Sequence, residues 1–358
     1  MTMVEERRVP LAELQRFVVE VLASVGVPDD EARIVADVLT SADVRGVDSH
    51  GVARLSRYVE CIESGKIARR AEIKVLSAWP AIARLDGGGG MGQVVGYRAM
   101  QRCLDMAERA GMASVSVTHS NHYGIAGYYA MMALPRGMIG ISLTNASPTA
   151  VPTFGRQRML GTNPLAMAVP AGNERPWVID MATTAIPVGK LEIAMRHGRQ
   201  LQYGVALDGA GKVTTDPWVA RREGALLPLG GPAETAGHKG YGLSVLVDIL
   251  SGVLSGSGYS STLRGGWGVS PIGHFFAAIR VDAVRPLAEF QAMMDQMIRD
   301  LRESPKALGH ERILIHGEPE FEAEEARRRD GIPLVAPVYE DLCKLAARLG
   351  VPAPRLLA

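Results

Sequence analysis

The chain has 358 residues, of which 47% are hydrophobic and 22% are charged, a composition that is typical of folded globular proteins and excludes wholesale disorder. At about 150 residues per domain, this length predicts two domains. The 39 basic and 38 acidic side chains leave a net charge of +1, so the excess of positive charge on which nucleic-acid and membrane-surface binding depends is missing.

The three cysteines, Cys61, Cys103 and Cys343, are odd in number and far apart, so they encode neither a disulfide framework nor a cysteine-rich metal site. The first residues, MTMVEERRVPLAEL, include acids and lack the apolar region of a signal peptide. The most apolar stretch, residues 243–254, is interrupted by Asp248 and is too short to span a bilayer. We therefore expect a reduced, cytoplasmic protein that binds neither nucleic acid nor membrane.

The first 65 residues predict helices. Apolar residues keep helical spacing over 11–22, and Gly26 ends that run. A second helix is expected from Asp29, and a third over residues 48–65.

From about residue 72 onward, strand-like runs alternate only partly with helical ones. Strands are expected around residues 73–75, 82–85, 112–118, 138–144, 164–170, 177–182, 274–284 and 312–316. Helices are expected over residues 93–110, 126–134, 190–196, 239–255 (a long buried helix), 286–302 and 318–330, with a last one before Gly350.

These elements predict a central α/β domain and a helical domain that is built from both chain ends. We expect an N-terminal helical segment over residues 1–75, the α/β domain over 76–290, and a C-terminal segment over 291–358 that packs back on the helical domain.

Gly87, Gly89 and Gly92 form a G-x-G-x-x-G between a predicted strand and a predicted helix, which is the setting of a dinucleotide-binding fingerprint. That fingerprint also needs an acid at the end of the next strand. The acids at the required distance, Asp105 and Glu108, lie inside the predicted helix. The pattern therefore favours a glycine turn over a Rossmann site.

The segment ADVRGVDSHGVARLSRYV contains the first candidate site. His50, Arg54 and Arg57 are spaced i, i+4 and i+7, which predicts one helical face with an imidazole and two guanidinium groups. A histidine beside an arginine suits a carboxylate substrate, because the arginine binds the carboxylate while the histidine exchanges a proton. The alternative is a surface helix with an incidental histidine.

The segment THSNHYGIAGYYAMMA places His119, Asn121 and His122 in a loop between a strand and a helix that opens at Gly124. Such turns often carry functional side chains and attract anions. A structural loop is the alternative, and a metal site is disfavoured because no carboxylate or cysteine completes a ligand set nearby.

Asp180 ends an apolar strand, where a carboxylate would orient a histidine, bond a ribose or amide, or cap a turn. Lys239 stands at a glycine-lined helix start, where it would hold a phosphate or carboxylate or simply be exposed. The sequence contains no P-loop, G-x-S-x-G or H-E-x-x-H, so the commonest kinase-like, hydrolase and zinc-protease classes are disfavoured.

Six ordered segments closely resemble the malate/L-lactate dehydrogenase family of the non-Rossmann type. They are RGVDSHGVARLSRY (45–58), SNHYGIAGYY (120–129), LGTNP (160–164), DMATT (180–184), GHKGYGL (237–243) and HGEPE (316–320). The resemblance implies a homodimer with a nicotinamide cofactor, NAD or NADP, bound on a mainly antiparallel or mixed sheet. It implies hydride transfer to or from a small 2-hydroxy or 2-oxo acid. The alternative, found among relatives, is NADPH-dependent reduction of a cyclic 2-imino acid.

The resemblance also implies roles for individual residues. His50 and His122 match proposed proton donors, with Ser49 beside His50, and Asp180 matches both a cofactor contact and a member of a Ser-His relay. Arg54 matches the substrate-carboxylate position, and Thr162 and Asn163 match pocket-lining positions. The remaining expected cofactor contacts are His122, Tyr123, Gly124, Ile125, Ala126, Met181, Ala182, Lys239, Gly317 and Glu318.

The chain departs from the family pattern at Phe154-Gly155-Arg156-Gln157, where members often have a second glycine, so the substrate cannot be carried over from any one relative. The choice between NAD and NADP also stays open, because Arg156, Arg175 or Arg196 could supply the cation for a 2′-phosphate. A binding protein without catalysis is a third alternative, which the presence of His50, Arg54, His122 and Asp180 disfavours.

Overall fold

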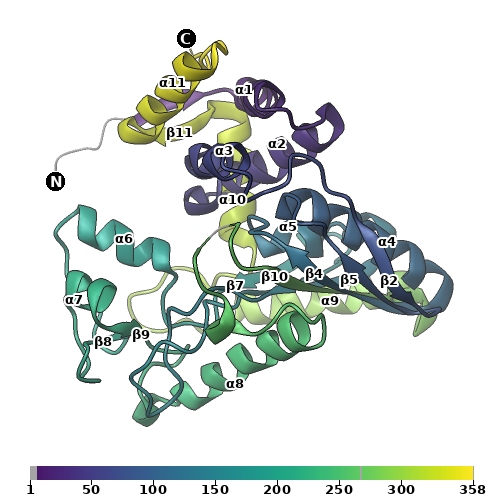
Figure 1. The fold of residues 1–358 in the computed structure, drawn as a ribbon. Coiled ribbons are helices and arrows are strands. Elements are labelled where there is room, and N and C mark those ends of the chain that lie inside the picture. The colour runs from purple at the N-terminus through teal and green to yellow at the C-terminus, as the bar shows by residue number, and fades with distance from the viewer. Residues whose placement is uncertain (1–5, 267, 358) are drawn as a thin grey trace.

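The computed structural model describes residues 6–266 and 268–357. Figure 1 shows three regions: a central sheet with its covering helices, a helical region near both termini, and a small lobe that contains α6, α7, β8 and β9.

The central sheet has seven strands and is mixed. In spatial order they are β2 (Lys74–Ala78), β3 (Ile82–Asp86), β4 (Met112–Ser120), β10 (Ile272–Arg280), β5 (Met138–Thr144), β6 (Leu165–Val169) and β7 (Trp177–Met181). Only the β3–β4 pair is parallel, because helix α4 (Gly92–Ala110) crosses over between these strands. The mainly antiparallel or mixed sheet that the resemblance implies is confirmed.

Helices cover both faces of this sheet. Helix α4 packs on β4 and β10, and α5 (Ala126–Met131) packs on β5 and β6. Successive strand residues face opposite sides, so His274 of β10 stacks on Tyr123 beside α5, whereas Gly273 contacts Ser251 on the other side. Ser251 belongs to a π-helical segment (Asp248–Val253) that continues α8 (Gly237–Val247).

The helical region joins the two ends of the chain. Its helices are α1 (Leu11–Ser24), α2 (Asp29–Val44), α3 (Leu55–Glu63), α10 (Glu318–Asp330) and α11 (Ala336–Leu349). Strand β1 (Glu6–Val9) pairs with β11 (Ile332–Val335), and the apolar side chains of α1 that recur at helical spacing are buried against α2. The expected helical domain from both ends is therefore observed.

Helix α9 (Leu287–Glu303) lies along the central sheet in Figure 1, and its Asp295 accepts hydrogen bonds from the turn at residues 172–174. The expected boundary near residue 290 falls inside this helix. The division into segments 1–75, 76–290 and 291–358 stays a prediction.

The small lobe has its own apolar core. It contains α6 (Val188–Arg196), β8 (Ala206–Leu207), α7 (Pro217–Arg222) and β9 (Ala225–Leu226). Leu191 of α6 packs with Leu201, Val205 and Leu226 in a cluster separate from the main core.

Three sequence predictions of secondary structure are wrong. Residues 312–316, all of them described, form no strand, because the Ile315 N–H donates to the Glu318 carboxylate instead of to a neighbouring strand. The helix over 239–255 is not buried, since Ile249 and Val253 are about half exposed. The helix expected from residue 48 is broken into the short turns Asp48–His50 and Val52–Arg54 before α3 begins.

Further short 3₁₀ turns connect the elements, at Leu134–Arg136, Ala233–Thr235, Ser260–Thr262 and Val281–Ala283. None of the helices within residues 6–266 and 268–357 is long and apolar enough to cross a membrane.

Candidate functional site

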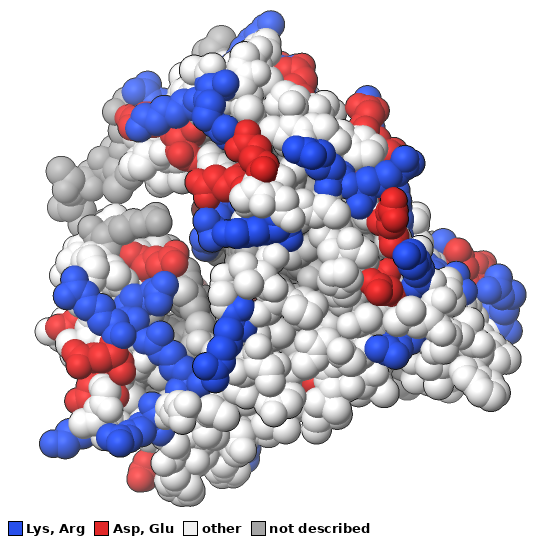
Figure 2. Space-filling model, in the orientation of Figure 1, with Lys and Arg blue, Asp and Glu red and all other residues white. Residues whose placement is uncertain are grey.

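A cavity of about 1000 Å³ lies where the three regions meet. Its walls come from the turn before α3, the segment after β4, the ends of β5 and β7, the start of α6, and the loop before α10. In Figure 2 the molecule is hollowed between the helical region and the small lobe, and Lys and Arg side chains stand on both sides of the hollow. The cavity volume is at the upper end of the roughly 300–1,000 Å³ that ligand pockets commonly have.

The turn before α3 brings Ser49, His50 and Arg54 into this cavity. Gly51 interrupts the helix between His50 and Arg54, so the expected single helical face with Arg57 is wrong, although Arg57 also lines the cavity. The Ser49 hydroxyl is 2.8 Å from Nδ1 of His50, and Nε of Arg54 donates to the Ser49 carbonyl at 2.7 Å. These bonds fix the imidazole and the guanidinium side by side.

His122 follows strand β4 and faces His50 across a ring-to-ring distance of 5.6 Å. Its Nδ1 lies 2.6 Å from the Tyr58 hydroxyl and 3.4 Å from the Gly124 N–H. Because a backbone N–H can only donate, Nδ1 acts as the acceptor, and the neutral ring carries its proton on Nε2. The structure thus brings together two histidines that are 72 residues apart in the sequence.

The surroundings of both histidines favour the neutral imidazole. Burial, with a smaller contribution from the Arg54 charge, lowers the pKa of His50 to about 4. Burial also lowers the pKa of His122 well below its ordinary value, and His50 and Arg54 add to this effect. A carboxylate placed against Arg54 would cancel part of this effect and raise both pKa values.

Asp180, near the end of β7, lines the same cavity and is exposed within it. Its Oδ2 accepts a hydrogen bond of 2.7 Å from the Gly127 N–H. Burial raises the pKa of Asp180 to about 6, and the positive charge of Arg45 opposes this rise. Across the described residues, Asp180 makes no hydrogen bond to Ser49 or His50, so its relay role stays a prediction.

Most of the other expected contacts also line the cavity. They are Tyr123, Gly124, Ile125, Ala126, Thr162, Met181, Ala182 and Gly317. Asn163 is fully buried behind the wall, where its amide accepts from the Ala146 N–H and donates to the Ser244 carbonyl. Asn163 therefore does not line the cavity as expected but supports Ala146, which does line it.

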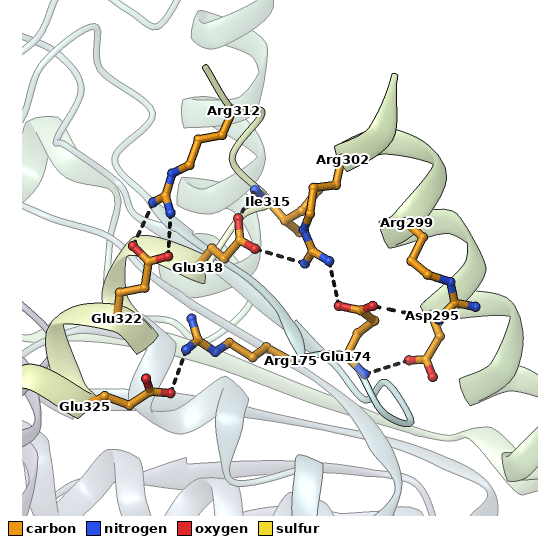
Figure 3. A network of polar contacts seen from close by, with 10 residues as sticks. All are labelled: Glu174, Arg175, Asp295, Arg299, Arg302, Arg312, Ile315, Glu318, Glu322 and Glu325. Carbon is orange, nitrogen blue, oxygen red and sulfur yellow. Dashed lines mark hydrogen bonds and ion pairs between the residues drawn. The ribbon is translucent and has the colours of Figure 1, made fainter. Parts of the chain in front are cut away.

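Two expected cofactor contacts lie outside the lining. Lys239 is exposed on the first turn of α8. Glu318 accepts from the Ile315 N–H at 3.0 Å and from Arg302 at 2.9 Å. Figure 3 shows these contacts within a larger network of arginines and acids that ties α9 and α10 to the loop at residues 312–317. Glu318 therefore holds the cavity-lining Ile315 in place.

Sequence reasoning missed three residues at this site. Tyr58 contacts His122 from 64 positions away, and Glu192 of α6 approaches Arg54 at 3.7 Å. The Thr149 hydroxyl lies in the cavity wall, is buried, and has no hydrogen-bond partner within the described structure. Tyr58 is the last residue of the first resemblance segment, which is the only sequence signal that any of the three gave.

The glycine turn at residues 87–92 has a packing role. In the described chain none of its glycines lines the cavity. Asn121 donates to the carbonyls of Gly89 and Gly90, and a Cβ on Gly92 would lie 2.1 Å from the Asn121 carbonyl oxygen. These contacts support the sequence-based preference for a glycine turn.

Comparison with known proteins identifies the family. Residues 9–343 match the family model for malate/L-lactate dehydrogenase. The chain belongs to the malate/L-lactate dehydrogenase family. It is therefore an oxidoreductase, and its family implies a nicotinamide cofactor.

Individual relatives of this malate/L-lactate dehydrogenase family member cover nearly all of its length. The malate dehydrogenase of Pyrococcus abyssi is 47% identical over 346 residues, which are 96% of this chain and 95% of the relative. The structure of malate dehydrogenase from Pyrococcus horikoshii OT3 superposes with a TM-score of 0.91 at 45% identity and covers 99% of both chains. The Δ1-piperideine-2-carboxylate reductase of Pseudomonas syringae superposes with a TM-score of 0.83 at 27% identity, covering 95% of this chain and 100% of that one.

Two features of the cavity are compatible with a nicotinamide cofactor. The cavity is large enough for a cofactor and a small acid together, and the Thr149 hydroxyl in its wall, which has no partner among the described residues, would bond a polar group of the cofactor. Residues 122–127 and 180–182 all line the cavity, and their backbone would hold the cofactor.

Proposed function

We propose that this protein catalyses reversible hydride transfer between a nicotinamide cofactor and a small 2-hydroxy or 2-oxo acid of the malate type. The observation that carries the proposal is the single cavity in which Arg54, His50 and His122 meet. The 47% identity to a malate dehydrogenase supports the malate-type substrate.

Arg54 binds the substrate carboxylate. Its Nε is held by the Ser49 carbonyl, which leaves the two terminal nitrogens for a bidentate contact with an acid. Glu192, at 3.7 Å, faces Arg54 and moves aside when the substrate carboxylate arrives. The contact orients the 2-carbon, and fixed orientation of this kind lowers the barrier.

One of the two histidines exchanges the substrate proton. A nicotinamide held by residues 122–127 and 180–182 would supply or accept the hydride. In the oxidation direction a neutral imidazole takes the proton of the 2-hydroxyl, which the low pKa of both rings permits at pH 7. Ser49 orients His50, and Tyr58 orients His122, by hydrogen bonds to Nδ1 of each ring.

We further propose that the protein works as a homodimer in the cytoplasm. The outer face of α8 and the π-helical segment exposes apolar side chains, which favours association with a second copy. Leu246, Ile249, Val253 and Leu254 form this face, each between 42% and 59% exposed. The free cysteines, two of them buried, accord with a reducing compartment.

A second candidate function is the reduction of a cyclic 2-imino acid. It is supported by the likeness to the Pseudomonas syringae reductase and by the presence of Ser49, His50 and Asp180 in one cavity. A protonated imine arrives already activated, whereas an oxo acid must gain a proton on oxygen, so the two reactions differ in pH profile.

The test is a substrate panel. Purified protein is mixed with NADH or NADPH and with oxaloacetate, pyruvate or Δ1-piperideine-2-carboxylate, and loss of the reduced nicotinamide is followed. Turnover of an open-chain oxo acid supports the proposed function and identifies the preferred cofactor. Turnover of the cyclic imine alone supports the second candidate, and turnover of neither contradicts both.

A further inference from the structure

A buried carboxylate lies directly behind the turn that carries His50. Asp43, on the last turn of α2, is only 1% exposed. Its Oδ2 accepts a hydrogen bond of 2.8 Å from the Val52 N–H. A buried carboxylate is costly unless its oxygens are hydrogen-bonded, so this bond fixes Val52 relative to α2.

The same carboxylate fills the space beside Gly51. A Cβ on Gly51 would lie 1.9 Å from Oδ1 and 2.2 Å from the carboxylate carbon of Asp43. Gly51 has a φ of −90°, outside the left-handed region that favours glycine. Glycine is therefore needed here because a Cβ would clash with the Asp43 carboxylate, and its absence lets the turn pack against Asp43.

Two further contacts hold the turn. Arg327, on α10, donates to the Asp43 carbonyl and to the Asp48 carboxylate, so it ties the start of the turn to the end of α2. On the opposite side, a Cβ on Gly189 would come within 3.1 Å of the Ser49 Cβ, which shows that α6 lies directly on the turn.

Asp43 itself is not among the residues that line the cavity. Any effect on catalysis must therefore pass through the turn at residues 48–52. His50 stands two residues before the anchored Val52, and Arg54 two residues after it, so one anchor sets the position of both groups.

We propose that Asp43 is a positioning residue for the proposed reaction, in which it holds the His50 turn in register through the Val52 N–H and the space left by Gly51. The kinetic consequence rests on the proposed function, whereas the effect on the His50 ring does not.

The kinetic experiment compares Asp43→Ala and Asp43→Asn with a matched control on the same helix. Glu31 of α2 is also 1% exposed, and it accepts hydrogen bonds of 3.0 Å from the Ala71 N–H and 3.2 Å from Arg98; none of these three residues lines the cavity. Glu31→Ala thus removes the same kind of bond without touching the turn.

We expect Asp43→Ala to lower kcat by about 100-fold, because small misplacements of catalytic groups have effects of this size. The KM for the nicotinamide should stay unchanged. Asp43→Asn should retain most of kcat, since its amide oxygen still accepts from the Val52 N–H. Glu31→Ala should lower the Tm and leave kcat unchanged. A folded Asp43→Ala variant with normal kcat, or equal losses in Asp43→Asn and Asp43→Ala, would overturn the proposal.

A second measurement does not need turnover. In protein labelled with ¹³C-histidine, the His50 signal is identified as the one missing in His50→Asn. We expect Asp43→Ala to shift this signal and Glu31→Ala to leave it in place, and an unshifted signal in Asp43→Ala would overturn the proposal. If wild-type protein reduces no oxo or imino acid, the proposed function fails while this spectrum still decides the role of Asp43.

Should Asp43→Ala fail to fold, Gly51→Ala provides the test. The added methyl group must push the turn away from Asp43, so we expect kcat to fall and the His50 signal to move. A folded Gly51→Ala protein with normal kcat and an unmoved signal would overturn the proposal.

Discussion

Two glycine-containing turns of this molecule invite comparison, the turn at residues 48–52 and the turn at residues 87–92. Each precedes a helix, and each matches a sequence pattern associated with function. The first turn places Ser49 and His50 in the cavity. The second has left-handed backbone at Gly88 and Gly89, with φ values of +60° and +67°, and packs against the segment after β4.

The two turns differ in the reason why each needs a glycine. Gly51 makes room for the Asp43 carboxylate, whereas Gly89 supplies a backbone conformation that other residues reach only with strain. Spacing of glycines along a chain therefore does not tell a binding loop from a packing turn. The neighbours of each turn in space decide this, and the predictions below test each side of the comparison.

The largest effect is expected at the first turn and its partner ring. His50→Ala and His122→Ala should each lower kcat. The loss should be about 10²–10⁴-fold for whichever histidine transfers the proton, because a positioned acid–base group contributes about that much. Binding of reduced nicotinamide, followed by fluorescence titration, should survive in both variants. His310→Ala, at an exposed position, serves as the control. Near-normal turnover in both cavity variants would contradict the site.

A third histidine, His274, lies outside the cavity lining and is hydrogen-bonded to the lining residue Thr144. His274 is fully buried between Thr144 and Ser120, and burial lowers its pKa to about 3 from an ordinary 6.5. The His274 imidazole therefore becomes protonated at a higher pH in the unfolded chain than in the folded one. Stability is therefore complete above pH 6.5 and is lost as the pH falls toward 3.

For His274 this loss amounts to about 3 kcal/mol between pH 6.5 and about pH 4. Urea unfolding of wild-type protein and of His274→Asn across this range provides the measurement. The variant should show a flatter dependence of the unfolding free energy on pH. Equal slopes in the two proteins would contradict the assignment of a neutral, buried His274.

Variants of Arg54 test whether the residues around the first turn also bind the carboxylate of the substrate. Arg54→Met should raise the KM for the 2-oxo acid by a factor of about 10–100, which corresponds to about 1.5–3 kcal/mol for charge-assisted hydrogen bonds. Arg54→Lys keeps the charge and loses the bidentate contact, so an intermediate KM is expected. A KM that is unchanged in Arg54→Met would place the carboxylate elsewhere.

The smallest effect is expected at the second turn. Gly89→Ala should lower the unfolding free energy by about 1–2 kcal/mol, because an L-residue is strained at a φ of +67°. The KM for the nicotinamide should not change, since the turn lies outside the cavity lining. A tenfold rise in this KM would show that the turn belongs to the cofactor site after all.

The sequence alone predicts most of the fold. Alternating strand patterns and helical spacing locate the strands of the central sheet, and the mixed character of the sheet follows from the resemblance to the family. The failures have local causes. Residues 312–316 are apolar enough for a strand, yet an acid and an arginine from other elements hold them as a loop over the cavity.

The site is predicted in its residue types and only partly in its geometry. His50, His122, Arg54 and Asp180 all line the cavity, but helical spacing could not reveal that Gly51 breaks the helix, because the cause is Asp43 on another element. Tyr58 and Glu192 were missed for the same reason. Each acts on its partner across more than 60 residues of chain, a separation that periodicity does not encode.

The central claim is direct transfer of a hydride between nicotinamide and the 2-carbon of the acid. The measurement is a reaction of the preferred oxo acid with reduced cofactor that carries deuterium at C4 in the transferred position, followed by mass spectrometry of the product. We expect one deuterium at C2 of the hydroxy acid and none when the cofactor is labelled in the other C4 position. A product without deuterium in both experiments would contradict hydride transfer at this site.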